Sequence, residues 1–187
     1  SKMYNKIART IIEFETLWHL AWSKSVEASK VGLHATLLVV HPTDKKLYVN
    51  FDREVLQLLR EAKCLLRMGA EVPESAQSVL LMESKLKSYY NKLAYALGQY
   101  ERVVSKVPAF LLSLFRPHLD EMDVAIAPGL TLLTWSSMNI DMYLASVHAA
   151  LFRLDELVTK ADDIVNNRIE RNLEAIRQCQ LVDLPEE

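Results

Sequence analysis

The 187-residue sequence is poor in the residues that break regular structure, with only four glycines and six prolines. A turn-rich β-sandwich uses many more of both, so their scarcity favours long regular elements. The glycines, Gly32, Gly69, Gly98 and Gly129, are also far apart. A phosphate-binding P-loop requires two glycines five residues apart followed by Lys and then Ser or Thr, because backbone amides must wrap the phosphates. The sequence therefore excludes a P-loop.

An excess of positive charge and a cysteine framework are absent as well. The formal net charge is −2, so no surplus of cations exists to neutralise phosphates, which argues against nucleic acid as a partner. The two cysteines, Cys64 and Cys179, lie far apart within helical patterns. This placement is typical of free thiols in an intracellular protein, and a disulfide or redox role is the alternative.

Long apolar runs are absent too. No run approaches the roughly 18 apolar residues of a membrane span, and no signal-peptide pattern opens the chain. We therefore expect no membrane partner. The chain begins with Ser1 and Lys2 in place of Met, which indicates a fragment of a longer protein.

The candidate catalytic and metal-binding groups can each be explained as ordinary polar residues on the surface of a helix. One acidic cluster contains His118, Asp120, Glu121 and Asp123. It could bind a cation, but acids that follow a proline are ordinary first-turn residues of a helix. The pairs Asp155-Glu156 and Asp162-Asp163 could perform acid–base chemistry, but on a long helix they are typical of a solvated face. We therefore expect no catalytic residue, no metal and no cofactor in this segment.

Residues 4–28 carry apolar side chains at three- and four-residue spacing, which predicts an amphipathic helix. Trp18 and Trp22 stand one turn apart on its apolar face. We expect both to pack against neighbouring helices, and an aromatic partner-binding face is the alternative.

Beyond Gly32 the spacing of the apolar residues changes from the pattern of a helix to that of an extended strand. Residues 36–41 are apolar and β-branched, residues 46–51 alternate, and turn-forming residues 42–45 separate them, which predicts a β-hairpin. A lone two-stranded hairpin is only marginally stable in water. It must therefore lie on helices, which is the interpretation that we prefer, or offer its edge to another chain.

Four further helices are predicted before residue 128, at about residues 52–68, 73–106, 109–115 and 118–127. Asp52 is placed to cap the first of them, and Gly69 to end it in a left-handed conformation. Pro73 and Pro117 suit positions where a missing N–H costs nothing. Pro128-Gly129 is expected to turn the chain into the last helix.

The two longer helices of this group have regular apolar stripes. In the first, the inward positions are predicted to be Val55, Leu58, Leu59, Ala62, Leu65 and Leu66. In the second, the stripe is predicted to contain Leu86, Tyr90, Leu93, Leu97, Tyr100, Val104 and Val107. Both follow the spacing of helices that pack along their length.

The longest uninterrupted pattern follows Gly129 and runs to Ile176, with Asn139 as the expected N-cap of a helix. Its apolar positions are Leu144, Val147, Leu151, Leu154, Val158, Ala161 and Val165, at alternating spacings of three and four. That spacing is typical of a coiled coil. Beyond Val165 the spacings widen to four, four and three, so the left-handed supercoil should relax there.

Taken together, the patterns predict an all-α, elongated bundle of long helices with one small β-hairpin. We expect a helical bundle at residues 1–128, with the hairpin near residues 35–51. The second part, residues 129–187, is expected to contain a turn with Gly129 and Trp135 followed by the long helix.

Two passages resemble the N-terminal tail of dynein heavy chains, particularly axonemal ones. The first contains Gly129-Leu130, Leu133-Thr134-Trp135, Ser137, Asn139-Ile140 and Tyr143. The second contains Asn50-Phe51-Asp52, Leu58-Leu59-Arg60-Glu61-Ala62-Lys63, Leu66, Gly69, Val72-Pro73 and Ala76. The apolar segment 35–42 looks like the strand that precedes the second passage in this family. The passages lie in family order and span most of the chain.

The resemblance implies a non-motor stem built from successive helical bundles, with the ATP-driven motor outside this segment. Such tails associate with another heavy chain, with intermediate and light chains and with axonemal docking proteins, and they attach the motor to the doublet microtubule of a cilium or flagellum. One alternative is the stem of a cytoplasmic or intraflagellar-transport dynein that attaches cargo. Another is an unrelated helical adaptor.

The late part of the last helix is where we expect a partner to bind. The predicted binding residues are Val158, Val165, Arg168, Ile169, Arg171, Leu173 and Ile176. Arginine is a common anchor in interfaces, although Glu170 and Glu174 could instead pair with the arginines along the helix. The prediction requires that Val165 and Ile169 are not buried within the chain itself.

Overall fold

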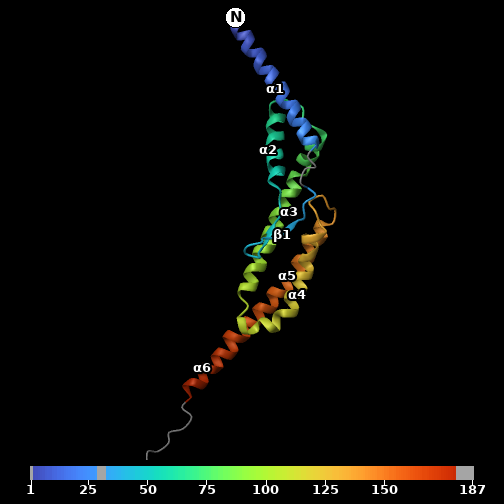
Figure 1. The fold of residues 1–187 in the computed structure, drawn as a ribbon. Helices are drawn as coiled ribbons and strands as arrows, with labels where there is room; N and C mark the ends of the chain where they lie inside the picture. Colours follow the sequence, from blue (N-terminus) through green and yellow to red (C-terminus); the bar gives the residue numbers. More distant parts are fainter. Residues whose placement is uncertain (1, 29–32, 180–187) are drawn as a thin grey trace, which may run out of the picture. The chain divides into compact units, whose positions relative to one another are not determined.

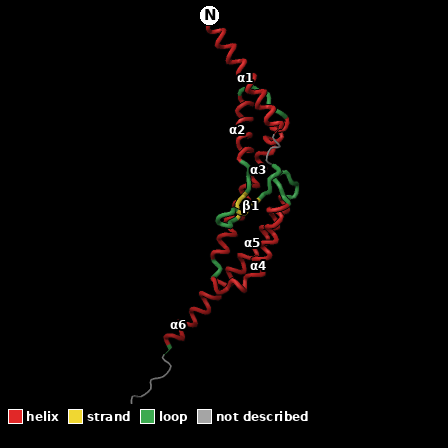
Figure 2. The backbone as a smooth tube through the Cα atoms, in the orientation of Figure 1, coloured by secondary structure: helices red, strands yellow, loops and turns green. Residues whose placement is uncertain are grey.

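A computed structural model describes residues 2–28 and 33–179, and it is helical for most of that length (Figure 1). Its helices are α1 (Lys2–Ala28), α2 (Arg53–Arg67), α3 (Glu74–Ser105), α4 (Leu112–Thr131), α5 (Ile140–Asp163) and α6 (Glu170–Gln178). A 3₁₀ turn, η1 (Ala109–Leu111), precedes α4, and a π-helical segment, η2 (Ile164–Ile169), joins α5 to α6. Figure 2 shows the single small sheet in yellow among helices in red. The predicted all-α class with one hairpin is confirmed.

The contacts divide the chain into two compact units. The first unit combines residues 1–94 with residues 128–141, and the second combines residues 95–127 with residues 142–187. Each unit is thus assembled from two separate stretches of sequence. The predicted domain boundary between residues 128 and 129 stays a prediction. Gly32, where the sequence predicts the change of period, lies outside the described residues.

The β-hairpin of the first unit pairs β1 (Leu38–Val40) with β2 (Leu47–Val49) in antiparallel register, with Val39 opposite Tyr48. The chain just before β1 is held by the turn that follows α4. Leu37 N–H donates to the carbonyl of Leu133 at 3.0 Å, and Thr36 bridges Thr134. Leu37 and Leu38 are fully buried. The first residues of the hairpin are therefore anchored in the core of its unit, whereas Val39, Val40 and Tyr48 are 42% to 45% exposed.

Trp135 is the centre of this core, at 1% exposure. Its indole N–H donates to the carbonyl of Asn50 at 2.6 Å, and its ring meets the Phe51 ring edge-on at 4.7 Å between centroids. Phe51 in turn meets Tyr90 of α3 edge-on at 6.0 Å. The two passages that resemble the dynein tail, one spanning α2 and the other running from the end of α4 into α5, therefore contact each other directly.

Helix α2 begins and ends as its sequence predicts. The Asp52 carboxylate accepts the Glu54 N–H at 2.9 Å, which satisfies one of the unpaired amides of the first turn. Gly69 has a φ of 76°, and Ala70 N–H returns to the carbonyl of Leu65 at 2.9 Å, which is the hydrogen bond of a Schellman cap. Five of the six predicted inward residues are buried; Leu66 is not.

Helix α3 has the predicted length, and Leu86, Leu93 and Val107 of the predicted stripe are buried. At the other positions the burial is shifted by one residue: Tyr89, Ala96 and Val103 are buried where Tyr90, Leu97 and Val104 were predicted, and Tyr90 is 42% exposed. Both stripes alternate three and four residues, so spacing alone cannot choose between them. The Tyr89 hydroxyl donates to Asp141 in the first turn of α5 at 2.7 Å, and this contact belongs to the observed stripe.

Helix α4 corrects two predictions about proline. Pro117 does not separate two short helices, and Pro128-Gly129 lies inside the last turns of α4. The chain leaves the helix only after Thr131, where Leu132 N–H and Leu133 N–H both donate to the carbonyl of Pro128. A proline inside a helix removes one hydrogen bond and costs about 3 kcal/mol. Burial of Phe115, Met122 and Ile126 in the second unit offsets this cost.

The last long helix starts at Ile140, directly after the predicted N-cap, and changes character after Asp163. The Glu170 N–H donates to the carbonyl of Val165, five residues back, as in a π-helix. The helix therefore has a wider turn in the region where the apolar spacing widens in the sequence.

Candidate protein-binding face of the last helix

The predicted partner-binding residues are divided by the structure into a buried member and an exposed group. Val158 is 2% exposed and belongs to the core of the second unit, together with Leu151 and Leu154. It packs within the chain and is not available to a partner. The exposed group begins with Val165, which is half-buried.

We call the exposed group the C-terminal face, and define it as Val165, Arg168, Ile169, Arg171, Leu173 and Ile176. Its three larger apolar residues, Ile169, Leu173 and Ile176, are between 48% and 61% exposed. Ile169, Leu173 and Ile176 have the i, i+4, i+7 spacing that keeps side chains near one side of a helix. Exposed apolar residues aligned in this way are typical of interaction sites.

Among the described residues, the two arginines of the C-terminal face have no acidic partner at ion-pair distance. In the described part of the chain, neither Arg168 nor Arg171 forms an ion pair, and both are exposed. The predicted pairing along the helix is found only for Arg177, whose guanidinium lies 3.7 Å from the Glu174 carboxylate. The face therefore presents an apolar stripe with two uncompensated positive charges beside it.

Four of the acidic residues that could have formed other sites are satisfied locally, whereas Asp155 is half-buried and its Oδ1 has no hydrogen-bond partner among the described residues. Asp120 lies 3.1 Å from Arg116 within α4, and Glu121 pairs with Arg153 of α5. Asp162 and Asp163 accept hydrogen bonds from asparagines one turn later. Within residues 2–28 and 33–179, no three His, Cys, Asp or Glu side chains are grouped to hold a metal ion. These residues are thus helix-surface groups.

Two other sequence features have plain structural outcomes. Cys64 and Cys179 are both exposed free thiols, as expected. Among the described helices, none is both long and apolar enough to cross a membrane.

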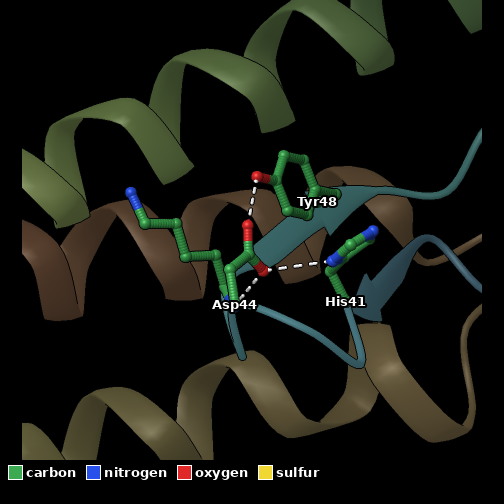
Figure 3. A network of polar contacts seen from close by, with 4 residues as sticks. His41, Asp44 and Tyr48 are labelled. Carbon is green, nitrogen blue, oxygen red and sulfur yellow. Dashed lines mark hydrogen bonds and ion pairs between the residues drawn. The ribbon is translucent and has the colours of Figure 1, made fainter.

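A polar network at the tip of the hairpin was not anticipated from the sequence (Figure 3). Asp44 accepts the Lys46 N–H at 3.0 Å and the Tyr48 hydroxyl at 2.8 Å, and the His41 ring lies 3.3 Å away. Lys45 between them has a φ of 57°, a left-handed conformation. The backbone hydrogen bond from Lys46, then that from Tyr48, lowers the pKa of Asp44 below its usual value of 3.8. The network stabilises the turn.

The lowered pKa of Asp44 predicts a pH-dependent hairpin tip. The folded state favours the ionised carboxylate, so its stabilising effect is present above the unfolded pKa, and is lost as the pH falls below about 3.8 through the folded value. We expect the protection factor of the Lys46 amide, its exchange rate relative to the intrinsic rate at the same pH, to fall below that pH. In Asp44→Asn the same amide should exchange quickly and lose this pH step. A step that persists in Asp44→Asn would assign it to another group.

Comparison with known proteins identifies the family. The sequence model described as "Dynein heavy chain, N-terminal region 1" matches residues 1–143. The chain is 50% identical over 184 residues to the dynein gamma chain of the flagellar outer arm of Chlamydomonas reinhardtii. It is 36% identical over 185 residues to human dynein axonemal heavy chain 8, and 37% identical over 186 residues to mouse dynein axonemal heavy chain 5.

These alignments cover 98% to 100% of this chain but only 4% of each relative. The chain thus spans a small part of the length of the proteins it matches. Trp135 and Asn50, which contact each other in the core of the first unit, both lie within the matched residues 1–143. The C-terminal face lies beyond residue 143, within the stretch aligned with the relatives. The chain belongs to the dynein heavy chain family, in which residues 1–143 match N-terminal region 1.

Proposed function

We propose that this chain is a non-motor tail segment of an axonemal dynein heavy chain, and that it serves as a structural and assembly module. In this role it links the microtubule motor to intermediate and light chains, to other heavy chains and to the axonemal doublet of a cilium or flagellum. The family match and the flagellar and axonemal relatives support the tail assignment. The sequence carries no P-loop, so we place the ATPase activity elsewhere in the heavy chain.

The observation that carries the assembly role is the C-terminal face. Its apolar residues stay exposed although the preceding part of the same stripe, up to Val158, is buried. Burial of apolar surface is the main favourable term in protein association. A helix of the partner that covers Ile169, Leu173 and Ile176 would continue the packing that α5 begins. Acidic residues on that partner would pair with Arg168 and Arg171 and set its orientation.

The mechanical side of the proposal depends on continuous helices. Helix α3 has 32 residues, about 48 Å at 1.5 Å per residue. Its hydrogen bonds run along the helix axis, so a force applied at one end is carried by the helix as a unit. We propose that helices of this kind transmit force from the motor while their exposed faces select the neighbouring subunits.

The two alternatives to this role are not equally supported. The family match excludes the hypothesis that the chain is an unrelated helical adaptor. A tail of a cytoplasmic or intraflagellar-transport dynein that attaches cargo is the second candidate. The names of the relatives, which are flagellar outer arm, axonemal and ciliary chains, favour the axonemal role.

The proposal is tested by capture from an axonemal extract. The 187-residue chain, immobilised, should retain dynein intermediate chains or a second heavy chain, identified by mass spectrometry. The double substitution Ile169→Glu and Leu173→Glu should reduce this retention at least tenfold, because it places charge on the apolar stripe. The matched control is Leu81→Glu, which changes an exposed leucine of α3 outside the C-terminal face.

Three outcomes are informative. Loss in the double variant with normal retention by Leu81→Glu supports binding through the C-terminal face. Equal retention by all three proteins contradicts it, and so does the absence of dynein subunits from the captured proteins. Charge reversal at Arg168 and Arg171 tests separately whether the arginines contribute to binding. Unchanged affinity for the captured dynein subunits would show that the arginines are not part of the interface.

A further inference from the structure

Helices α4 and α5 carry a second exposed apolar surface, which the proposed role of the last helix does not use. We call it the α4–α5 surface, and define it as Val124 of α4 with Met142, Ala145, Ala149 and Phe152 of α5. Val124, Met142 and Phe152 are between 70% and 76% exposed, and the two alanines are exposed as well. The α5 residues follow one another at spacings of three, four and three, so they lie along one side of the helix, opposite its buried side.

The two helices lie side by side and run antiparallel (Figure 1). Near the start of α5 the Tyr143 hydroxyl donates to the carbonyl of Ile126 at 3.2 Å. Further along α5 the Arg153 guanidinium pairs with Glu121, which lies earlier in α4. The contacts therefore move back along α4 as α5 advances.

The ion pair also shows which side chains of the two helices face the same way. Val124 follows Glu121 by three residues, and Ala149 precedes Arg153 by four, so each is one turn from the ion pair on the same side of its helix. Because the helices are antiparallel, both turns lead in the same direction. Val124 thus lies at the level of Ala149, and the apolar surface extends over both helices.

The charges of the two helices are unbalanced. Helices α4 and α5 contain eight Asp and Glu residues but only three Arg and Lys residues. Each of the three bases pairs with one acid, in the ion pairs Arg116–Asp120, Arg153–Glu121 and Lys160–Glu156. The other five carboxylates have no ion-pair partner among the described residues; they are Asp123, Asp141, Asp155, Asp162 and Asp163. The two helices therefore carry a surplus of negative charge.

We propose that the α4–α5 surface binds a basic amphipathic helix of a partner protein. Apolar side chains of this helix would cover Met142 and Phe152, and the small side chains of the two alanines between them allow close approach. The stripe continues beyond Phe152 through Glu156 and Asp163, at spacings of four and seven, and so changes from apolar to acidic along α5. Lysines or arginines that follow the apolar turns of the partner would lie beside these carboxylates.

The surplus charge selects this occupant over others. Nucleic acid and an anionic membrane would be repelled by the uncompensated carboxylates, and so would an acidic helix. The C-terminal face differs in this respect, because its arginines favour an acidic partner. The two surfaces would thus select partners of opposite charge.

The first experiment locates binding with a cysteine placed on the surface. Ala149→Cys is made in a background with Cys64→Ser and Cys179→Ser, and its alkylation by iodoacetamide, a neutral reagent, is timed with and without peptide. The probe is a helical peptide of about 15 residues made of leucine and lysine, with the leucines on one face. We expect saturating peptide to slow the alkylation at least tenfold. Leu81→Cys in the same background is the control, and its alkylation should be unchanged.

A peptide of the same pattern with glutamate in place of lysine tests the charge preference. At the same concentration it should leave the alkylation of Ala149→Cys unchanged, because its carboxylates are repelled by those of α4 and α5.

The second experiment measures the affinity of the leucine–lysine peptide by fluorescence anisotropy. Phe152→Lys should weaken binding at least tenfold, because it removes an apolar contact and repels the lysines, and circular dichroism should show that the helices remain. Leu81→Lys makes the same change in charge outside the surface and should have little effect. Asp123→Asn with Asp163→Asn should weaken binding at least threefold at about 0.05 M salt but little at about 0.3 M, where screening reduces the attraction.

Three results would each overturn the proposal: no protection of Ala149→Cys by the leucine–lysine peptide, equal protection by the two peptides, or equal affinity of Phe152→Lys and Leu81→Lys. None of them bears on the C-terminal face, because Ile169 and Leu173 are unchanged in every protein used.

Discussion

Trp135→Ala should lower the free energy of unfolding by about 3–5 kcal/mol, because it removes the largest buried side chain of the first unit. The substitution deletes the edge-on contact with Phe51 and leaves the carbonyl of Asn50 without its indole donor. This contact joins the hairpin and the start of α2 to the turn before α5. Urea denaturation followed by circular dichroism measures the loss.

Two further substitutions separate the causes. Trp135→Phe keeps an aromatic ring but removes the N–H, so part of its loss, about 1–3 kcal/mol, reports the buried carbonyl of Asn50. Leu132→Ala changes an exposed residue of the same turn and should alter stability by less than about 0.5 kcal/mol. A loss below about 1 kcal/mol in Trp135→Ala would show that the indole is not central to the unit.

Leu154→Ala should destabilise the second unit by about 2–5 kcal/mol, because Leu154 is almost completely buried in α5. The cavity left behind would lie among the residues that hold α5 in the core of this unit. Phe152, two residues earlier on the same helix, is exposed, so Phe152→Ala should have an effect below about 0.5 kcal/mol. The larger deletion should thus have the smaller effect.

Hydrogen exchange locates each loss. We expect Leu154→Ala to increase exchange in residues 142–158, and Trp135→Ala to increase it around the hairpin and the start of α2. Equal losses in Leu154→Ala and Phe152→Ala would contradict the burial of α5. Loosening of the hairpin region by Leu154→Ala, with residues 142–158 still protected, would contradict the division into units.

Features that depend on neighbouring residues were predictable. The cap at Asp52 and the end of α2 at Gly69 follow from hydrogen bonds within one turn of the chain, and α5 starts directly after the predicted cap residue Asn139. Near Val165 the apolar spacing predicted only a relaxed supercoil, and the structure has a π-helical segment there. These effects are local, so a short stretch of sequence contains all the groups that produce them.

The errors came from features that distant segments control. Pro117 and Pro128 were expected to end helices, yet α4 includes both, because the contacts of its buried face stabilise it beyond the cost of a lost hydrogen bond. The stripe of α3 was predicted one residue too late at Tyr90. Only the position of Asp141, which binds Tyr89, distinguishes the two stripes.

The same limit applies to the candidate binding residues. Spacing placed Val158 and Ile169 in one continuous seam, and nothing in the seam itself marks where its neighbours end. The structure buries Val158 and exposes Ile169, so the C-terminal face starts later than the sequence suggested. Trp18 and Trp22 of α1 were expected to pack against neighbouring helices; Trp22 donates to Glu61 of α2, whereas Trp18 is 45% exposed.

The sequence by itself determined the helical class, the caps, the hairpin and the family resemblance, because these depend on side chains close together along the chain or on their order. Only the tertiary structure decided which apolar faces are covered. It brings Asn50 to Trp135, 85 residues away, and it leaves the C-terminal face and the apolar side chains in the first half of α1 exposed. The physical reason is that burial is a property of two surfaces, and a pattern on one helix describes only one of them.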